Sequence, residues 1–136
     1  MNSPHWVLDT NVVVSGLLNP AGAPGQLLIA VRDGRIRAGW TPSILSEYAS
    51  VLRRPKFRFP QPLVANLISS FAEAWEIKHT PKLRFQLPDR SDEVFLAAAL
   101  GTTDKLLVTG NVKHFPAESR MDVTVLIPAD AIKRLP

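Results

Sequence analysis

The sequence has no cysteine, which excludes disulfide bonds and thiolate metal sites. It also has no apolar run approaching the roughly 20 residues that a helix needs to cross a bilayer. Its first residues, MNSPHWVL, do not place a basic region before a long apolar segment, so no signal peptide is expected. These absences predict a cytoplasmic protein that does not contact a membrane.

The composition is that of an ordinary globular chain with a positive net charge. Its 136 residues are 46% hydrophobic and 21% charged, enough for one domain with a substantial core. The net charge of +4 favours a polyanionic partner, although many small basic proteins bind none. We therefore expect a single domain over residues 1–136 and look to its motifs for the partner.

Strand-like and helix-like segments alternate along the chain. Strands are expected at residues 6–8, 35–41, 105–111 and 123–128, and helices after Pro24, Pro42 and Pro62 and within PDRSDEVFLAAALG. The third of these helices has an apolar stripe made of Val64, Leu67, Ile68, Phe71 and Trp75. The alternation predicts an α/β protein, a three-layer α/β/α sandwich with a mostly parallel central sheet.

Polar residues interrupt the apolar pattern where two expected strands end. The triplet Asp9-Thr10-Asn11 follows the first strand, and Thr109-Gly110-Asn111 follows LLV. Burying an unpartnered carboxylate costs several kcal/mol, so Asp9 either marks an exposed strand end or binds something. In parallel sheets, ligand sites form at the carboxyl ends of strands.

Two further groups of acids lie near helix starts, and each also has a purely structural interpretation. Asp89, Asp92 and Glu93 can simply cap a helix and complement its dipole. Glu47 is one residue beyond the capping-box position set by Ser43 and borders the apolar stripe of its helix, or it lies on a solvated face. If the acids instead converge on one cleft, hard cations such as Mg²⁺ or Mn²⁺ would relieve their repulsion and serve phosphodiester hydrolysis.

Four blocks of the sequence, taken together, resemble the PIN domain family. They are VLDTNVVVSGLL, SILSEYASVLRRPKF, PDRSDEVFLAAAL and LLVTGNVKHFP, and they keep the family's order and spacing over nearly the whole chain. The group they resemble most is the VapC-like toxin components of toxin–antitoxin systems. The resemblance implies a metal-dependent endoribonuclease that uses Mg²⁺ or Mn²⁺, is restrained by an antitoxin protein, acts on RNA and often forms a homodimer.

The resemblance also assigns roles to individual residues. Asp9 matches the family's first acid, Glu47 the acid on the second main helix, and Asp92 the third acid, with Glu93 as an adjacent alternative. Thr10 and Asn11 are expected to organise the acid loop, with the Thr109 hydroxyl near the site.

The fourth position departs from the family pattern. Where many relatives have an acid, this chain has Asn111, which can position a water but adds no charge. His114 follows where some relatives place another acid, and it can equally be a surface turn residue. A weaker second metal site is expected, and the alternative is a catalytically quiet PIN-like module that binds RNA or a partner.

Candidate RNA contacts lie in the run RRPKFR at the end of the Glu47 helix. Its four cations can bind phosphates or only complement the helix dipole, and they are Arg53, Arg54, Lys56 and Arg58. Two other classes fit less well. A haloacid-dehalogenase-type enzyme needs a second aspartate at the position of Asn11, and a receiver-like domain needs an aspartate where KLLVTGN has none.

Overall fold

The computed structural model describes residues 3–136, and within them the chain forms one five-stranded sheet. Its strands are β1 (His5–Leu8), β2 (Arg37–Trp40), β3 (Trp75–Glu76), β4 (Leu106–Val108) and β5 (Thr124–Leu126). Their order in the sheet is β3-β2-β1-β4-β5, and every neighbouring pair is parallel. The α/β prediction is confirmed, and the sheet is parallel throughout.

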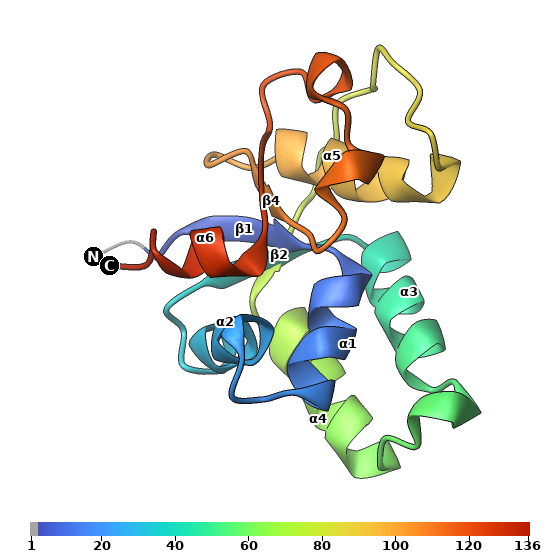
Figure 1. Cartoon of the computed structure of the whole chain (residues 1–136), viewed down its shortest axis with the longest axis vertical. Coiled ribbons are helices and arrows are strands. Elements are labelled where there is room, and N and C mark those ends of the chain that lie inside the picture. The colour runs from blue at the N-terminus through green and yellow to red at the C-terminus, as the bar shows by residue number, and fades with distance from the viewer. Residues whose placement is uncertain (1–2) are drawn as a thin grey trace.

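Helices cover both faces of this sheet. They are α1 (Thr10–Leu18), α2 (Ala23–Arg32), α3 (Pro42–Leu52), α4 (Gln61–Ala72), α5 (Glu93–Leu100) and α6 (Pro128–Ile132), with short 3₁₀ turns at Pro55–Phe57, Arg90–Asp92, Val112–His114 and Ala117–Ser119. Figure 1 shows α5 on one side of the sheet and α1, α2 and α4 on the other, with α3 beside α1. This is the predicted three-layer sandwich.

The helix starts follow from local chemistry. Asp9 caps α1 by accepting a 2.7 Å hydrogen bond from the Thr10 backbone N–H. Thr41 caps α3 in the same way, with its hydroxyl 3.3 Å from the Ile44 N–H, and Pro42 occupies the first turn. After α2, Gly34 adopts a φ of +76°, which a residue without Cβ tolerates. These caps set where the chain leaves and re-enters the sheet.

The expected third helix is longer than the observed one. α4 ends at Ala72, and Trp75 belongs to β3 instead, with 43% of its surface exposed. The backbone of β3 pairs with β2, Trp75 lying opposite Gly39, so pairing at the sheet edge replaces the last helical turn. The helix α6 was not expected from the sequence, because five residues are too few to show a period.

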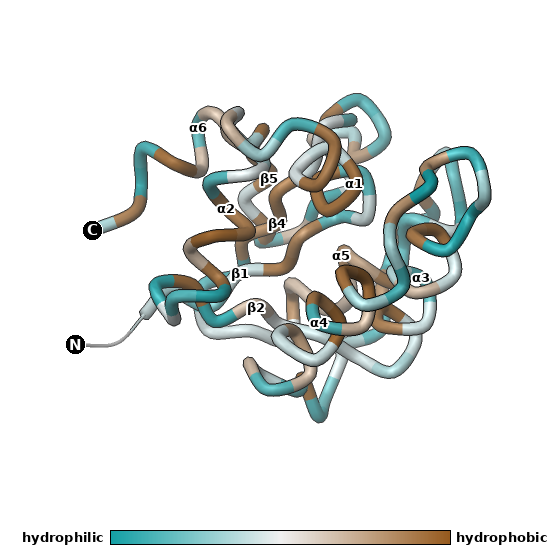
Figure 2. Tube along the Cα trace, turned by 90° about the horizontal axis from the view of Figure 1, so that it is seen from below, coloured by the Kyte–Doolittle hydropathy of each residue, from teal (hydrophilic) through white to brown (hydrophobic). Residues whose placement is uncertain are grey.

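The core lies between the sheet and its helix layers. The apolar residues of β1 and β4 are all buried, and Figure 2 shows hydrophobic segments along both strands in the interior. The buried Tyr48 hydroxyl donates a hydrogen bond to the Leu8 carbonyl, which ties α3 to the end of β1. Within residues 3–136 no single helix is long and apolar enough to cross a membrane; α1 and α2 meet that test only jointly, and they are bent by 101° relative to each other.

Candidate functional site

The sheet topology brings the two polar triplets together. The strand β1 is at the centre of the sheet. The next strands in the chain, β2 and β3, lie on one side of it, and β4 and β5 lie on the other side. The carboxyl ends of β1 and β4 therefore meet at the switch point, where ligand sites form in parallel sheets. The Asp9 backbone N–H donates to the Val108 carbonyl at 2.9 Å, so the two triplets start from paired strands.

Asp9 is buried at this switch point, with 5% of its surface exposed. Its Oδ1 accepts the capping hydrogen bond from Thr10, and its Oδ2 accepts hydrogen bonds from the Thr109 hydroxyl at 2.8 Å and the Asn11 amide at 3.1 Å. Its carboxylate is therefore neither an exposed strand end nor unpartnered. These three hydrogen bonds fix its orientation at the edge of the sheet.

Asn11 joins the two triplets. Its Oδ1 accepts a 2.8 Å hydrogen bond from the Gly110 N–H, and its Nδ2 lies 3.4 Å from the Thr109 hydroxyl. That hydroxyl also accepts from the Asn111 N–H at 3.0 Å. Asn111 is exposed and contributes its backbone to this network. The structure thus gathers Thr10, Asn11 and Thr109 around Asp9.

Glu47 reaches the same edge from α3. The Thr10 hydroxyl donates a hydrogen bond to Glu47 Oε2, which links α3 to the first turn of α1. Glu47 is half-buried, so it lies at the margin of the core and not on a fully solvated face. The neighbouring Tyr48, through its bond to Leu8, fixes the position of this turn, a contact that the sequence does not predict.

Asp92 and Glu93 are adjacent but have different partners. Asp92 Oδ2 lies 3.1 Å from His114 Nδ1, and only 13% of the Asp92 side chain is exposed. Glu93 Oε2 accepts a 3.0 Å hydrogen bond from the Leu87 N–H and pairs with Arg90 at 3.0 Å. Glu93 is thus occupied in holding the preceding loop to the start of α5.

Asp89 also has a local structural contact. Its Oδ1 accepts from the Ser91 N–H at 2.9 Å and caps the 3₁₀ turn Arg90–Asp92. Of the three acids in this segment, Asp92 is the one whose carboxylate faces a histidine across the chain and not its own loop.

The carboxylates influence each other's titration. Burial is the main cause that raises the pKa of Asp9 to about 6; the charges of Asp92 and Glu47 act in the same direction, while the hydrogen bonds from Thr109 and Thr10 oppose the shift. Burial is also the main cause of a raised pKa at Asp92, to which Asp89 and Glu47 add and which His114 opposes. The charges of Glu47 and Asp92 thus repel that of Asp9, although the three acids come from different segments of the chain. A bound cation would relieve this repulsion.

The donor chemistry of this site fits Mg²⁺ or Mn²⁺, which take oxygen ligands and retain several waters. Among residues 3–136, however, no three histidine, cysteine or acidic side chains stand close enough to hold one ion directly. Asp9, Glu47 and Asp92 are the carboxylates that could hold the ion, with water completing its coordination.

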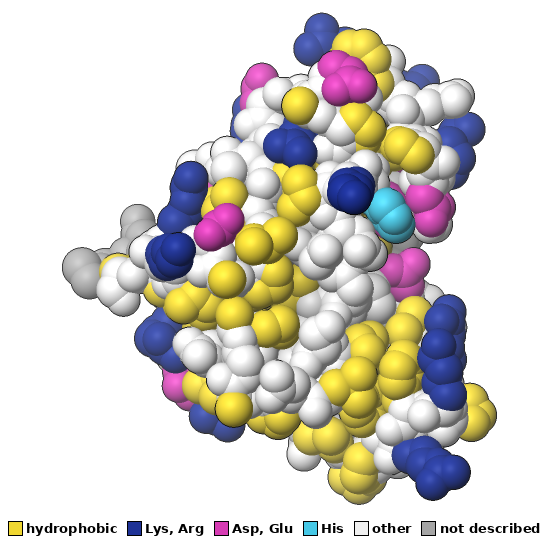
Figure 3. Space-filling model, viewed as in Figure 1, with side chains coloured by type: hydrophobic (Ala, Val, Ile, Leu, Met, Phe, Trp, Pro, Cys, Tyr) yellow, Lys and Arg dark blue, Asp and Glu magenta, His cyan; other side chains and the backbone are white. Residues whose placement is uncertain are grey.

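Four cations lie at the end of α3 and in the turn after it, and all are exposed: Arg53, Arg54, Lys56 and Arg58, here called the basic cluster. Phe57 stacks on Phe59 at 5.4 Å between ring centroids, and the Lys56 ammonium lies 5.0 Å from the Phe57 ring. Figure 3 shows a notch at the right-hand margin, between α5 and α3, where acidic side chains and a histidine gather. Basic side chains lie above and below this notch.

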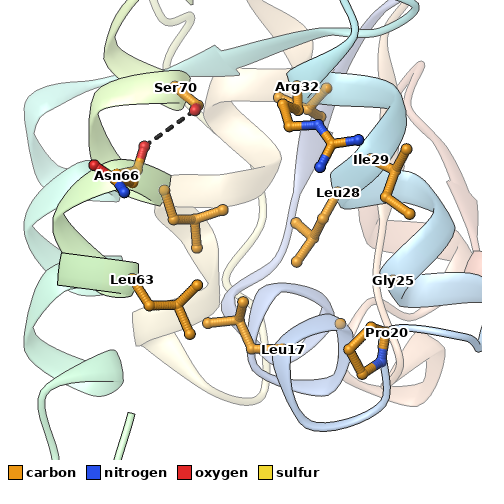
Figure 4. A pocket seen from close by; sticks show the side chains of 12 residues that line it. Leu17, Pro20, Gly25, Leu28, Ile29, Arg32, Leu63, Asn66 and Ser70 are labelled. Carbon is orange, nitrogen blue, oxygen red and sulfur yellow. Dashed lines mark hydrogen bonds between the residues drawn. The ribbon is translucent and has the colours of Figure 1, made fainter. Parts of the chain in front are cut away.

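A hollow elsewhere on the molecule lacks this chemistry. It encloses about 230 Å³ between α1, α2 and α4, and leucine side chains point into it, among them Leu17, Leu28 and Leu63 (Figure 4). Arg32 is the one charged residue in its lining among residues 3–136. The hollow therefore offers an apolar surface rather than acid–base or metal-binding chemistry.

This parallel α/β sandwich, with a buried acid at its switch point, is compatible with a nuclease-type domain, and the comparison with known families separates that class from the others that share the arrangement. The family model described as "PIN domain" matches residues 5–113, and the chain belongs to the PIN domain family. The chain is also similar to an uncharacterized protein of Methanocaldococcus jannaschii, MJ1680, with 29% identity over 109 residues, covering 77% of this chain and 69% of that protein. PIN domains are generally nucleases that bind nucleic acid and use divalent metals.

Proposed function

We propose that this PIN domain is an endoribonuclease that hydrolyses RNA phosphodiester bonds with the help of Mg²⁺ or Mn²⁺. The observation that carries the proposal is the setting of Asp9, which is buried at the switch point of the sheet and whose pKa is raised to about 6 by burial and, to a smaller extent, by the charges of Asp92 and Glu47. A buried acid held by three hydrogen bonds among like charges is typical of a functional site.

When bound, a divalent ion would supply a nucleophilic water at neutral pH and neutralise charge on the departing oxygen. The residues of the chain would prepare the site for it. Asp9 would be the central ligand, because Thr10, Asn11 and Thr109 already fix its orientation. Thr10 would also orient Glu47, and His114 would orient Asp92, so each outer carboxylate has one positioning partner.

Asn111 would orient water at the edge of the site through its neutral amide oxygen, which accepts a hydrogen bond. Its position next to Gly110 is held by the bonds that Asn11 and Thr109 make to this segment. Glu93 is left with a supporting role, since its carboxylate already binds Arg90 and the Leu87 N–H.

RNA would reach the carboxylates across the basic cluster. Its four exposed cations lie at the end of the helix that carries Glu47, so phosphates bound there would lead the strand toward the acids. The stacked rings of Phe57 and Phe59 offer an apolar surface beside these charges.

The proposal extends to a toxin of a toxin–antitoxin pair that works as a homodimer in the cytoplasm with an antitoxin protein as partner. This part is supported by the resemblance of the four sequence blocks to VapC-like toxins. Induced expression of the chain in a bacterial host tests it, since a toxin arrests growth and the Asp9→Asn variant does not. Light scattering of the purified protein tests the dimer.

A second candidate function is a catalytically weak PIN module that binds RNA or a protein partner. It is favoured by the neutral Asn111 at the fourth acidic position and by the lack of a direct three-ligand cluster among residues 3–136. Metal-dependent cleavage distinguishes the two functions.

The test is cleavage of an end-labelled structured RNA by the purified protein with Mn²⁺, with Mg²⁺ and with EDTA, alongside the Asp9→Asn variant. The nuclease proposal predicts cleavage that needs the metal and is lost in the variant. Cleavage that persists in the variant or in EDTA would overturn the proposal. RNA binding without cleavage would favour the second candidate.

A further inference from the structure

A second hollow lies at the opposite end of the sheet from Asp9, Glu47 and Asp92. It encloses about 530 Å³, within the range of about 300–1,000 Å³ typical of small-ligand sites. It is lined at the amino ends of β1 and β2, by the edge strand β3 and by the segment after α6; its side chains include His5, Arg37, Trp75, Thr103, Asp104 and Arg134. Figure 1 shows the C-terminus and the start of β1 near this end of the sheet, away from α3.

The centre of the hollow is an aromatic platform. Trp75 is 43% exposed, and the Arg37 guanidinium lies over its indole, 5.3 Å from the ring centroid. The His5 ring packs edge-on against the same indole at 4.8 Å. A guanidinium stacked on an indole presents a flat, weakly hydrated cation, the kind of surface on which nucleobases stack.

The position of these side chains follows from strand register. His5 lies opposite Arg37, and Gly39 lies opposite Trp75, so all four residues project from one face of the sheet. Gly39 has no side chain, which leaves room there for His5: a Cβ added to Gly39 would come within 3.1 Å of His5 Nε2. The platform is thus built into the sheet and does not depend on a loop.

The charges around the platform select an anion that also carries hydrogen-bond donors. Arg37 and Arg134 supply two exposed guanidinium groups. Burial lowers the pKa of His5, which disfavours the charged form of its ring. Asp104 uses Oδ2 to accept a 2.5 Å hydrogen bond from the His5 N–H, which leaves Oδ1 to accept from a ligand.

We propose that this hollow binds a nucleoside phosphate, either as a free nucleotide or as one nucleotide of a nucleic-acid strand. The base stacks on Trp75 and Arg37, the phosphate contacts the two guanidinium groups, and Asp104 accepts from a ribose hydroxyl or a base N–H. A phosphoserine or phosphothreonine side chain would satisfy the arginines but offers no planar group for the indole. The site is separate from the proposed cleavage centre and does not require it to be active.

The test uses the full chain carrying Asp9→Asn, so that RNA cannot be consumed and the outcome does not depend on catalysis. AMP, adenosine, inorganic phosphate and a short single-stranded oligonucleotide are titrated while the indole N–H signals are followed by NMR. AMP should shift the Trp75 signal and leave that of Trp6, which is 3% exposed, unchanged. AMP should also bind more tightly than adenosine or phosphate.

In calorimetric titrations, Arg37→Gln and Trp75→Leu should each weaken AMP binding at least about fivefold, since stacking and charge-assisted contacts are each expected to contribute that much. Arg35→Gln removes an exposed arginine outside the hollow and should leave the affinity unchanged. If Trp75→Leu fails to fold, the paired variant Arg37→Gln/Arg134→Gln carries the test.

Tighter binding of the oligonucleotide would identify a strand as the source of the nucleotide, and equal affinities would identify a free nucleotide. Both outcomes support the proposal. It is overturned if neither AMP nor the oligonucleotide shifts the Trp75 signal, if phosphate alone binds as tightly as AMP, or if Arg37→Gln binds as well as its parent.

Discussion

Asp9 and Thr109, which lie 100 residues apart in the sequence, are joined by a 2.8 Å hydrogen bond from the Thr109 hydroxyl to Asp9 Oδ2. Both residues directly follow strands that are neighbours in the sheet. The bond therefore holds the carboxyl ends of β1 and β4 together at the switch point of the sheet. Because Thr109 is completely buried, bulk water does not reach its hydroxyl.

The first prediction concerns this bond. Replacing Thr109 by Val keeps the shape but removes the donor, and should lower the free energy of unfolding by about 1–2 kcal/mol. Thr109→Ser keeps the hydroxyl and is the matched control. Urea unfolding measures both variants. A Val variant as stable as the parent would mean that the bond does not contribute to stability.

The second prediction concerns pH. The pKa of Asp9 rises from 3.8 to about 6 on folding, so between these values the folded chain binds more protons at Asp9 than the unfolded chain. Stability should therefore fall as pH rises through this window, by about 3 kcal/mol in total, and change no further from this group above it. Asp9→Asn does not titrate and should lack this decrease.

Urea unfolding in EDTA at about pH 4 and about pH 8 checks the difference between the parent and Asp9→Asn. The free energy of unfolding of Asp9→Asn, relative to that of the parent, should increase from about pH 4 to about pH 8. The altered hydrogen bonds of the variant add a difference that is the same at both pH values and does not affect this comparison. A difference in stability that is the same at both pH values would contradict the shifted pKa.

The third prediction distinguishes the two adjacent acids. Asp92→Asn should reduce the cleavage rate by at least about 100-fold, because it removes a charge from the proposed centre. Glu93→Gln should keep the rate within a few-fold and instead reduce stability by about 1 kcal/mol, since it weakens the interactions with Arg90 and the Leu87 N–H. Rates and unfolding free energies are measured on both. A reversed pattern would assign the third ligand to Glu93.

The fourth prediction concerns salt. Replacing Arg54 and Lys56 by Gln should weaken RNA binding, and should make log K depend less steeply on log salt by about 0.7 for each phosphate that is no longer neutralised. Arg35→Gln, away from the basic cluster, should leave that slope unchanged. Filter binding in the Asp9→Asn background gives both slopes. An unchanged slope in the double variant would show that these two cations do not bind phosphate.

Much of the fold could be predicted because its signals are local. Prolines and caps mark the starts of α2, α3 and α4, and short apolar runs mark β1, β4 and β5. The strand β3 could not be predicted, because two residues are too few to show a period. Trp75 also lies at the spacing that continues the apolar stripe of α4, which favoured a helix there. Its place is decided by pairing with β2, which is a contact between distant segments.

Part of the candidate site could also be predicted from local sequence, whereas the rest depends on contacts between distant segments. Asp9 could be singled out because a carboxylate inside an apolar run is unusual in any sequence. The choice between Asp92 and Glu93 could not be made, since one residue of helical rotation decides it, and that rotation depends on Leu87, Arg90 and His114. The bond between Thr10 and Glu47 likewise requires the packing of α3 against α1.

The central claim, that Asp9 anchors a divalent ion among three carboxylates, is tested most directly by calorimetric titration of Mn²⁺ into the metal-free protein at neutral pH. Glu93→Gln is titrated as a charge-matched control for Asp9→Asn. The claim predicts a binding isotherm for the parent and for Glu93→Gln, and its loss in Asp9→Asn. Equal Mn²⁺ affinity in Asp9→Asn and the parent would contradict it.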